Sequence, residues 1–160
     1  MNHHSEHTGH RAHLERGFTL IEVMVVVLVI GILLAIGVPT YLGARERAQD
    51  QAARSTLRSG QTTAAVVYVD RGTYRDANVR NLRAAEPGFI WRGSNSASRD
   101  QDELSVAATR DGREWGAATR SDSGECFFIR LRADGSTLYG SSSSQPCTGS
   151  SALGVTDREW

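Results

Sequence analysis

One apolar stretch near the N-terminus constrains this chain more than any other feature. From Phe18 to Val38 there are 21 residues with a single charged side chain, Glu22. A helix rises about 1.5 Å per residue, so this stretch would span roughly 30 Å, about one hydrocarbon core of a bilayer. The sequence therefore predicts one membrane-spanning helix.

The carboxylate of Glu22 is unusual in such a helix. An ionised Asp at the centre of a membrane helix costs about 2.5 to 3.5 kcal/mol on insertion scales, and the cost should be smaller for a residue so close to the helix start. No Lys or Arg lies between Arg16 and Arg45, so the membrane segment contains no cationic partner. Cleavage between Gly17 and Phe18 would create an α-amino group one helical turn from Glu22, in the same chain or in a neighbouring chain.

The segment from Gly17 to Pro39, GFTLIEVMVVVLVIGILLAIGVP, resembles the class III signal of the type IV pilin and pseudopilin family. The resemblance implies that a prepilin peptidase cleaves after Gly17 and methylates the new N-terminal Phe18. It also implies that Glu22, at the fifth mature position, guides assembly. Gly31 and Pro39 match the family positions at which the helix can loosen.

The same resemblance implies an α+β fold. One long helix, transmembrane and then amphipathic, would pack against a small head made of an antiparallel β-meander. The expected domains are a cleaved leader, a transmembrane and assembly half of the helix, an amphipathic half, and a globular head with a disulfide-bounded tail, at residues 1–17, 18–40, 41–70 and 71–160. The precursor would cross the cytoplasmic membrane once, with its N-terminus in the cytoplasm and its head outside.

Residues 1–17 contain all five histidines of the chain, a composition that can bind metal. No cysteine accompanies these histidines and no folded scaffold is evident, so we favour a discarded leader over a metal site. The main alternative is an ordinary secretory signal peptide, cut at a small-x-small site such as Ala35-Ile36-Gly37. The apolar stretch is longer than the usual core of about 7 to 15 residues, and Glu22 would hinder simple insertion.

The pattern changes from uniformly apolar to amphipathic between Tyr41 and Asp70. Apolar residues recur there at steps of three and four. They are Tyr41, Ala44, Ala48, Ala52, Ala53, Leu57, Ala64, Val67 and Tyr68. We expect one helix from Phe18 to about Asp70, ended by Gly72. The alternative is a membrane helix that ends at Pro39 and is followed by a separate helix, since proline removes a backbone hydrogen bond.

The segment 72–103 is predicted to be loop-like, because it contains Pro87-Gly88 and a long polar run. It is the place of the αβ-loop that the resemblance implies. Phe89, Ile90 and Trp91 are expected to pack onto the long helix.

Short β-prone runs separated by Asp-Gly or Ser-Gly turns follow, and they predict an antiparallel meander. Its strands are expected at residues 104–109, 114–120, 125–132 and 136–140. In the third strand Phe127, Ile129 and Leu131 share one face, which should cover the C-terminal half of the long helix. Residues 141–144 are predicted to be flexible, and residues 150–160 show no clear pattern.

Both cysteines of the chain, Cys126 and Cys147, lie beyond the membrane stretch. An exported segment with an even cysteine count favours one disulfide. It would close a loop of about 22 residues and contribute roughly 3 kcal/mol in the chain-entropy model.

Sequence motifs for catalysis are absent. There is no Walker-type loop, nucleophile elbow, HExxH or CxxC, and no histidine would remain after leader removal. The acidic cluster Asp100, Asp102 and Glu103 lacks the glycine and the terminal glutamate of an EF-hand loop, so we expect a solvated loop there. The net charge of zero gives no support for nucleic-acid binding. We predict no catalytic residue, metal site or cofactor, and a protein that is not an enzyme.

The resemblance implies a structural subunit of a type IV pilus-like filament, which moves from the membrane to the cell surface. Its partners would be other pilin subunits, prepilin peptidase, the inner-membrane assembly platform, and membrane lipid before assembly. Two alternatives stay open. One is a pseudopilin of a type II secretion or competence system, and the other is a membrane-tethered minor pilin that acts as an adhesin or a DNA-binding module.

Overall fold

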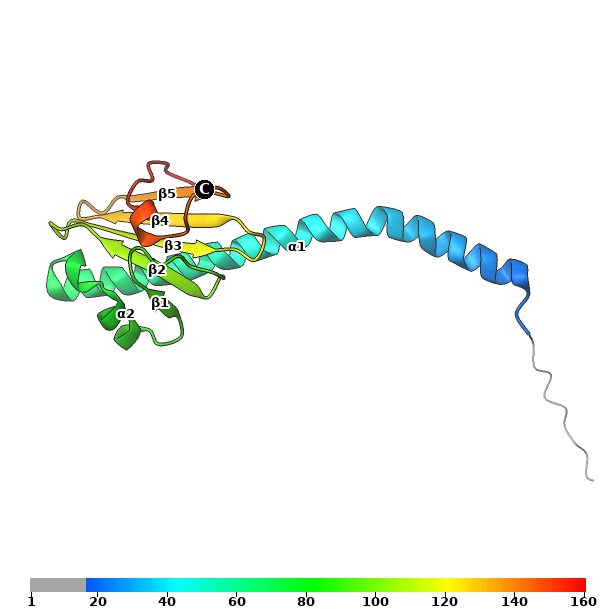
Figure 1. The fold of residues 1–160 in the computed structure, drawn as a ribbon, viewed down its shortest axis with the longest axis horizontal. Helices are drawn as coiled ribbons and strands as arrows, with labels where there is room; N and C mark the ends of the chain where they lie inside the picture. The colour runs from blue at the N-terminus through cyan, green and yellow to red at the C-terminus, as the bar shows by residue number, and fades with distance from the viewer. Residues whose placement is uncertain (1–16) are drawn as a thin grey trace, which may run out of the picture. The chain divides into compact units, whose positions relative to one another are not determined.

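The computed structural model describes residues 17–160, and Figure 1 shows the order of its elements. The elements are α1 (Leu20–Arg71), the 3₁₀ turn η1 (Tyr74–Asp76), α2 (Val79–Ala85), β1 (Ile90–Arg92), β2 (Glu103–Ala108), β3 (Glu114–Arg120), β4 (Cys126–Arg132), β5 (Thr137–Ser142) and α3 (Gly149–Ala152). The chain divides into two compact units between Tyr41 and Leu42. One long apolar helix and a mostly antiparallel sheet confirm the predicted α+β class.

Helix α1 is continuous through Pro39. The alternative of two separate helices is therefore wrong. The helix ends at Arg71, where Gly72 adopts φ 72° and its N–H donates to the Tyr68 carbonyl at 2.7 Å. A positive φ of this kind is favourable for glycine and is a common helix stop. The predicted end at about Asp70 is correct to one residue.

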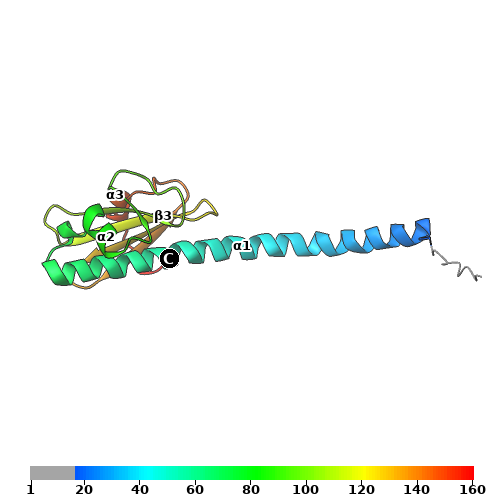
Figure 2. The same ribbon diagram turned by 90° about the horizontal axis from the view of Figure 1, so that it is seen from below.

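Within the second unit, the C-terminal part of α1 runs along the sheet (Figures 1 and 2). Its buried residues recur at steps of four and three, and they are Ala53, Leu57, Gly60, Ala64 and Val67. The apolar stripe that the sequence predicts begins earlier, at Tyr41. In the structure Tyr41, Ala44 and Ala48 are exposed, so this part of the stripe is not buried. Contact with the sheet begins near Asp50, whose carboxylate accepts hydrogen bonds from the β3–β4 turn.

The five strands lie in the order β1-β2-β3-β4-β5. Strands β2 to β5 form the predicted antiparallel meander, and their bounds lie within two residues of the expected ones. Strand β5 continues to Ser142, because Ser141 and Ser142 pair with Phe127 and Cys126. The prediction of a flexible segment is therefore wrong for its first two residues.

The segment predicted as a loop contains three elements. Thr73 caps η1 and Asn78 caps α2, in each case with a side-chain oxygen that accepts from the following backbone N–H groups. The third element, β1, pairs in parallel with β2, with Ile90 opposite Glu103. Successive strand residues point to opposite faces, so Trp91 is buried whereas Ile90 is 51% exposed. The prediction that Ile90 packs on the helix is wrong.

The sheet buries side chains on both faces. On the face toward α1, Phe127, Ile129 and Leu131 join the main hydrophobic core, as predicted. On the opposite face, Phe128 of β4 packs with the two cysteines and Ala152 of α3. Figure 2 shows α1 and α3 on opposite sides of the sheet.

The last residues of the chain are also ordered against the head. Strand β5 lies at the edge of the sheet. On its outer side, the backbone of Tyr139 forms an isolated bridge with Asp157. The indole of Trp160 lies 4.5 Å from the Tyr139 ring and donates to the Phe128 carbonyl at 3.1 Å. The guanidinium of Arg54 lies 5.8 Å from the same indole.

Candidate processing and assembly site

The three residues before α1 form an exposed, non-helical lead-in. Gly17, Phe18 and Thr19 have no regular secondary structure, and the side chain of Phe18 is 79% exposed. The predicted scissile bond between Gly17 and Phe18 is therefore accessible to a protease within the described residues. The leader residues before Gly17, with their histidines and Arg16, lie outside the described part of the chain.

Thr19 caps the N-terminus of α1. Its hydroxyl accepts a hydrogen bond from the Glu22 backbone N–H at 3.2 Å, and its carbonyl accepts from the same N–H at 3.1 Å. This pattern satisfies one of the unpaired donors at a helix start. The pattern Thr-x-x-Glu at residues 19–22 is that of a capping box, and it is the sequence signal from which this cap could have been predicted.

The carboxylate of Glu22 stands in the first turn of α1. A negative charge is favourable there because the helix N-terminus carries a partial positive charge. Within residues 17–160 the carboxylate has no hydrogen-bond donor and no ion-pair partner, since only the backbone N–H of Glu22 is bonded. Glu22 is exposed, so its carboxylate remains available to a group outside this chain.

The apolar helix that follows is uncovered. Every side chain from Phe18 to Leu42 is exposed, and α1 is the one helix in the described residues that is long and apolar enough to cross a membrane. None of its most apolar stretch is buried by the rest of the chain. An apolar surface of this extent needs lipid or other helices around it.

Gly31 and Pro39 lie inside this helix. A Cβ built on Gly31 would meet no atom within 4 Å, so packing within the chain does not require glycine there. Pro39 has no backbone N–H to donate to the fourth preceding carbonyl. One residue later, the Thr40 hydroxyl adds a second hydrogen bond to the Ile36 carbonyl at 3.2 Å. One helical hydrogen bond is thus missing at Pro39, one of the two positions where the resemblance implies loosening.

The two cysteines are joined. Cys126 and Cys147 form a disulfide with a Cα–Cα distance of 5.5 Å, which confirms the predicted pair. The bond ties the segment after β5 to the start of β4. A hydrogen bond also holds this segment, since the backbone N–H of Ser98 donates to the Cys147 carbonyl at 2.8 Å.

The acidic cluster differs from the predicted solvated loop at one of its three residues. Glu103 is buried and its carboxylate pairs with the guanidinium of Arg92. The Arg92 side chain holds the pKa of Glu103 below its ordinary value, and the backbone N–H of Arg99 acts in the same direction. Asp100 and Asp102 are exposed. In the described residues, no group of three or more His, Cys, Asp or Glu side chains is placed to hold a metal ion.

Residues 13–38 match the protein family described as the prokaryotic N-terminal methylation motif. The chain is 38% identical over 93 residues to the type IV major pilin protein PilA of Myxococcus xanthus, covering 58% of this chain and 42% of that one. It is 33% identical over 97 residues to the type IV major fimbrial protein FimA of Dichelobacter nodosus, covering 58% and 62%. No solved structure gives a significant match.

A secretion protein is similar as well. The type II secretion system core protein G of Pectobacterium carotovorum subsp. carotovorum is 35% identical over 66 residues, covering 41% of this chain and 42% of that one. The family match at residues 13–38 includes Gly17, Phe18 and Glu22, the residues on which the resemblance to pilins and pseudopilins rests. The aligned parts make up 41% to 58% of this chain and span 42% to 62% of the length of these relatives.

Proposed function

We propose that this chain is a structural subunit of a type IV pilus-like filament. A prepilin peptidase would cleave between Gly17 and Phe18 and methylate the amine of Phe18. The mature chains would then polymerise through their apolar helices, with the help of an inner-membrane assembly platform. No catalytic residue, cofactor or nucleic acid enters this proposal.

The observation that carries the proposal is the uncovered helix that begins directly after an accessible Gly17–Phe18 bond. Cleavage at this bond leaves the whole helix on the mature chain. In the precursor, lipid would cover the apolar side chains from Phe18 to Leu42. In the filament, the same side chains would be covered by the helices of other subunits. We infer a single-pass precursor with a cytoplasmic N-terminus and an external head.

Glu22 would set the register between subunits. The new amine of Phe18 stays cationic after methylation, and it would pair with the Glu22 carboxylate of an adjacent chain. A subunit inserted at another height would bury an unpaired carboxylate among apolar helices, which is strongly unfavourable. Thr19 already caps the start of α1, so the Glu22 carboxylate is not needed for that role.

Substitution of Glu22 tests this mechanism. We expect Glu22→Ala to insert into the membrane and to be cleaved, whereas the yield of sheared filaments falls about tenfold or more, because 1.4 kcal/mol of lost pairing already corresponds to tenfold. Asp70→Ala, an exposed acid at the other end of the same helix, is the matched control and should assemble normally. Normal filaments from Glu22→Ala would contradict the register role.

A pseudopilin of a type II secretion system is the second candidate, favoured by the similarity to core protein G. It would share the processing and the helix packing described above. The length of the filaments and the identity of the neighbouring genes distinguish the two functions. Long surface filaments support the pilus, and short periplasmic assemblies beside secretion genes support the pseudopilus.

A further inference from the structure

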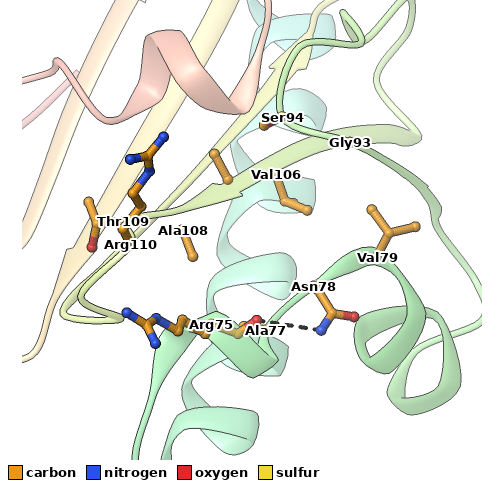
Figure 3. Close-up of a pocket in the computed structure, with 11 residues that line it drawn as sticks. Arg75, Ala77, Asn78, Val79, Gly93, Ser94, Val106, Ala108, Thr109 and Arg110 are labelled. Atoms are coloured by element: carbon orange, nitrogen blue, oxygen red, sulfur yellow. Dashed lines mark hydrogen bonds between the residues drawn. The ribbon is translucent and has the colours of Figure 1, made fainter.

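A cavity of about 600 Å³ opens in the head between η1, α2 and the end of β2. We call it the arginine pocket. Its lining includes Arg75, Asn78, Val79, Val106, Ala108 and Arg110 (Figure 3). The side chains of Arg75 and Arg110 lie on the same side of the pocket as Thr109 (Figure 3). Valine and alanine side chains give the remaining wall an apolar character.

The arginine pocket carries two positive charges without a matching acid. No carboxylate lines it, and neither Arg75 nor Arg110 forms an ion pair within residues 17–160. The nearby Asp111 carboxylate is held in its own turn, where it accepts from the Thr109 hydroxyl at 2.6 Å and from the Arg113 N–H at 3.1 Å. Each of the two guanidiniums therefore offers a planar, charged group that can bind a carboxylate.

A second cavity of about 540 Å³ has the opposite charge. We call it the acidic pocket. It is lined by Glu46, Asp50 and Glu125 together with Arg54, which gives three carboxylates and one guanidinium. The Asp50 carboxylate already has hydrogen-bond partners, since it accepts from two serine hydroxyls of the β3–β4 turn. The carboxylates of Glu46 and Glu125 make no hydrogen bond or ion pair in the described chain.

The two pockets lie at opposite ends of the sheet. The arginine pocket includes Thr109 and Arg110, which precede β3, and the acidic pocket includes Ser123 to Glu125, which follow it. Strand β3 has seven residues, so the two ends are separated by roughly 20 Å at about 3.3 Å per residue. Two complementary surfaces at opposite ends of one molecule cannot meet in the same copy.

On the basis of the filament function proposed above, we propose that the arginine pocket of one head receives Glu46 and Glu125 of a second copy. The two guanidiniums match the two unpaired carboxylates in number and in charge. Such a contact joins different surfaces of identical chains, so each copy can contact a further copy in the same direction, as a filament requires. It would fix the contact between heads in a polar filament.

Paired charge reversals in the full-length chain test this contact. Arg75→Glu with Arg110→Glu, or Glu46→Arg with Glu125→Arg, should each lower the yield of sheared filaments about tenfold, since like charges would then face each other. The chain with all four substitutions restores opposite charges and should recover filaments. Arg80→Glu with Arg158→Glu, two exposed arginines outside both pockets, is the control and should have no effect.

Cysteine crosslinking in membranes tests the contact without relying on filaments. Chains with Ala108→Cys and chains with Ser143→Cys, produced together and oxidised, should give mixed disulfide dimers that neither variant gives alone. Mixed dimers without filaments would retain the contact and contradict the pilus function. Filaments without mixed dimers, or a fourfold variant that assembles no better than either double variant, would overturn the contact and leave the pilus function standing.

Discussion

Thr19 and Glu22 have separate roles at the start of α1. The Thr19 hydroxyl satisfies a backbone donor of the first turn, which an N-cap residue does at a gain of about 1 kcal/mol. The carboxylate of Glu22 is left without a partner in residues 17–160. A carboxylate that lies in an apolar helix without a partner among these residues would be stabilised by a cation from elsewhere, and the amine of a neighbouring chain is the cation that we propose.

Glu103 makes the stability of the head depend on pH. Its folded-state pKa is lowered from the ordinary 4.5, chiefly by the side chain of Arg92. A lowered pKa stabilises the folded state above the unfolded pKa, and this stabilisation is lost as the pH falls through the folded pKa. We expect the melting temperature of the purified chain to fall less between pH 7 and pH 3 in Glu103→Gln than in the unaltered chain.

The lowered pKa values of Asp111 and Asp134 act in the same direction, so the variant should keep part of the acid sensitivity. An equal loss of melting temperature in both chains would show that the pair between Arg92 and Glu103 contributes nothing to the pH dependence.

At the scale of elements, the four-residue helix α3 depends on one close contact. The N–H of Gly149 donates to the buried Ser105 hydroxyl at 2.8 Å. A Cβ at Gly149 would overlap the backbone of Val106 and Ala107 in β2, which cannot move as a side chain can. Gly149→Ala should therefore destabilise the head by about 1 to 3 kcal/mol, the usual cost of overpacking.

Gly154→Ala is the matched control for this substitution. The nearest atom to its added Cβ would be the Ser151 carbonyl oxygen at 3.4 Å, an ordinary contact. Urea unfolding of the three chains measures the difference. If Gly149→Ala and Gly154→Ala unfold at the same urea concentration, the close packing of α3 on β2 is wrong.

The elements also show what could be predicted from the sequence. The end of α1 and the strands β2 to β5 follow from hydrophobic period and from turn residues, which act locally. The short elements η1, α2 and β1 depend on tertiary contacts, because seven or three residues cannot form a stable helix or strand alone. Trp91 of β1 packs over Gly60 of α1, which confirms that Trp91 packs on the long helix, but no local pattern identifies Gly60 as its partner.

The residues of the processing and assembly site could also be identified from a local sequence pattern. Gly17, Phe18 and Glu22 lie in one continuous motif, so the sequence alone could name them, and their roles remain predictions. The arginine pocket could not be predicted. Arg75 and Arg110 come from distant parts of the sequence, and the segments that carry them are joined where the Tyr74 N–H donates to the Gly112 carbonyl at 2.9 Å.

At the scale of the whole molecule, the chain consists of an uncovered helix and a head with its own core. The two units differ in how far their apolar side chains are buried within the described residues. The head buries its large apolar side chains on both faces of one sheet, whereas the apolar side chains from Phe18 to Leu42 stay exposed. A single copy thus leaves its apolar helix uncovered in water, and under the proposed function retention of this helix after processing would be the requirement for polymerisation.

Mass spectrometry of the mature chain tests this requirement most directly. The chain is isolated from membranes and sheared filaments of cells that contain a prepilin peptidase, and its N-terminal peptide is sequenced. We predict a chain that starts at Phe18 with a methylated α-amino group. A chain that starts near Val38, or an intact chain that still carries residues 1–17, would contradict the account.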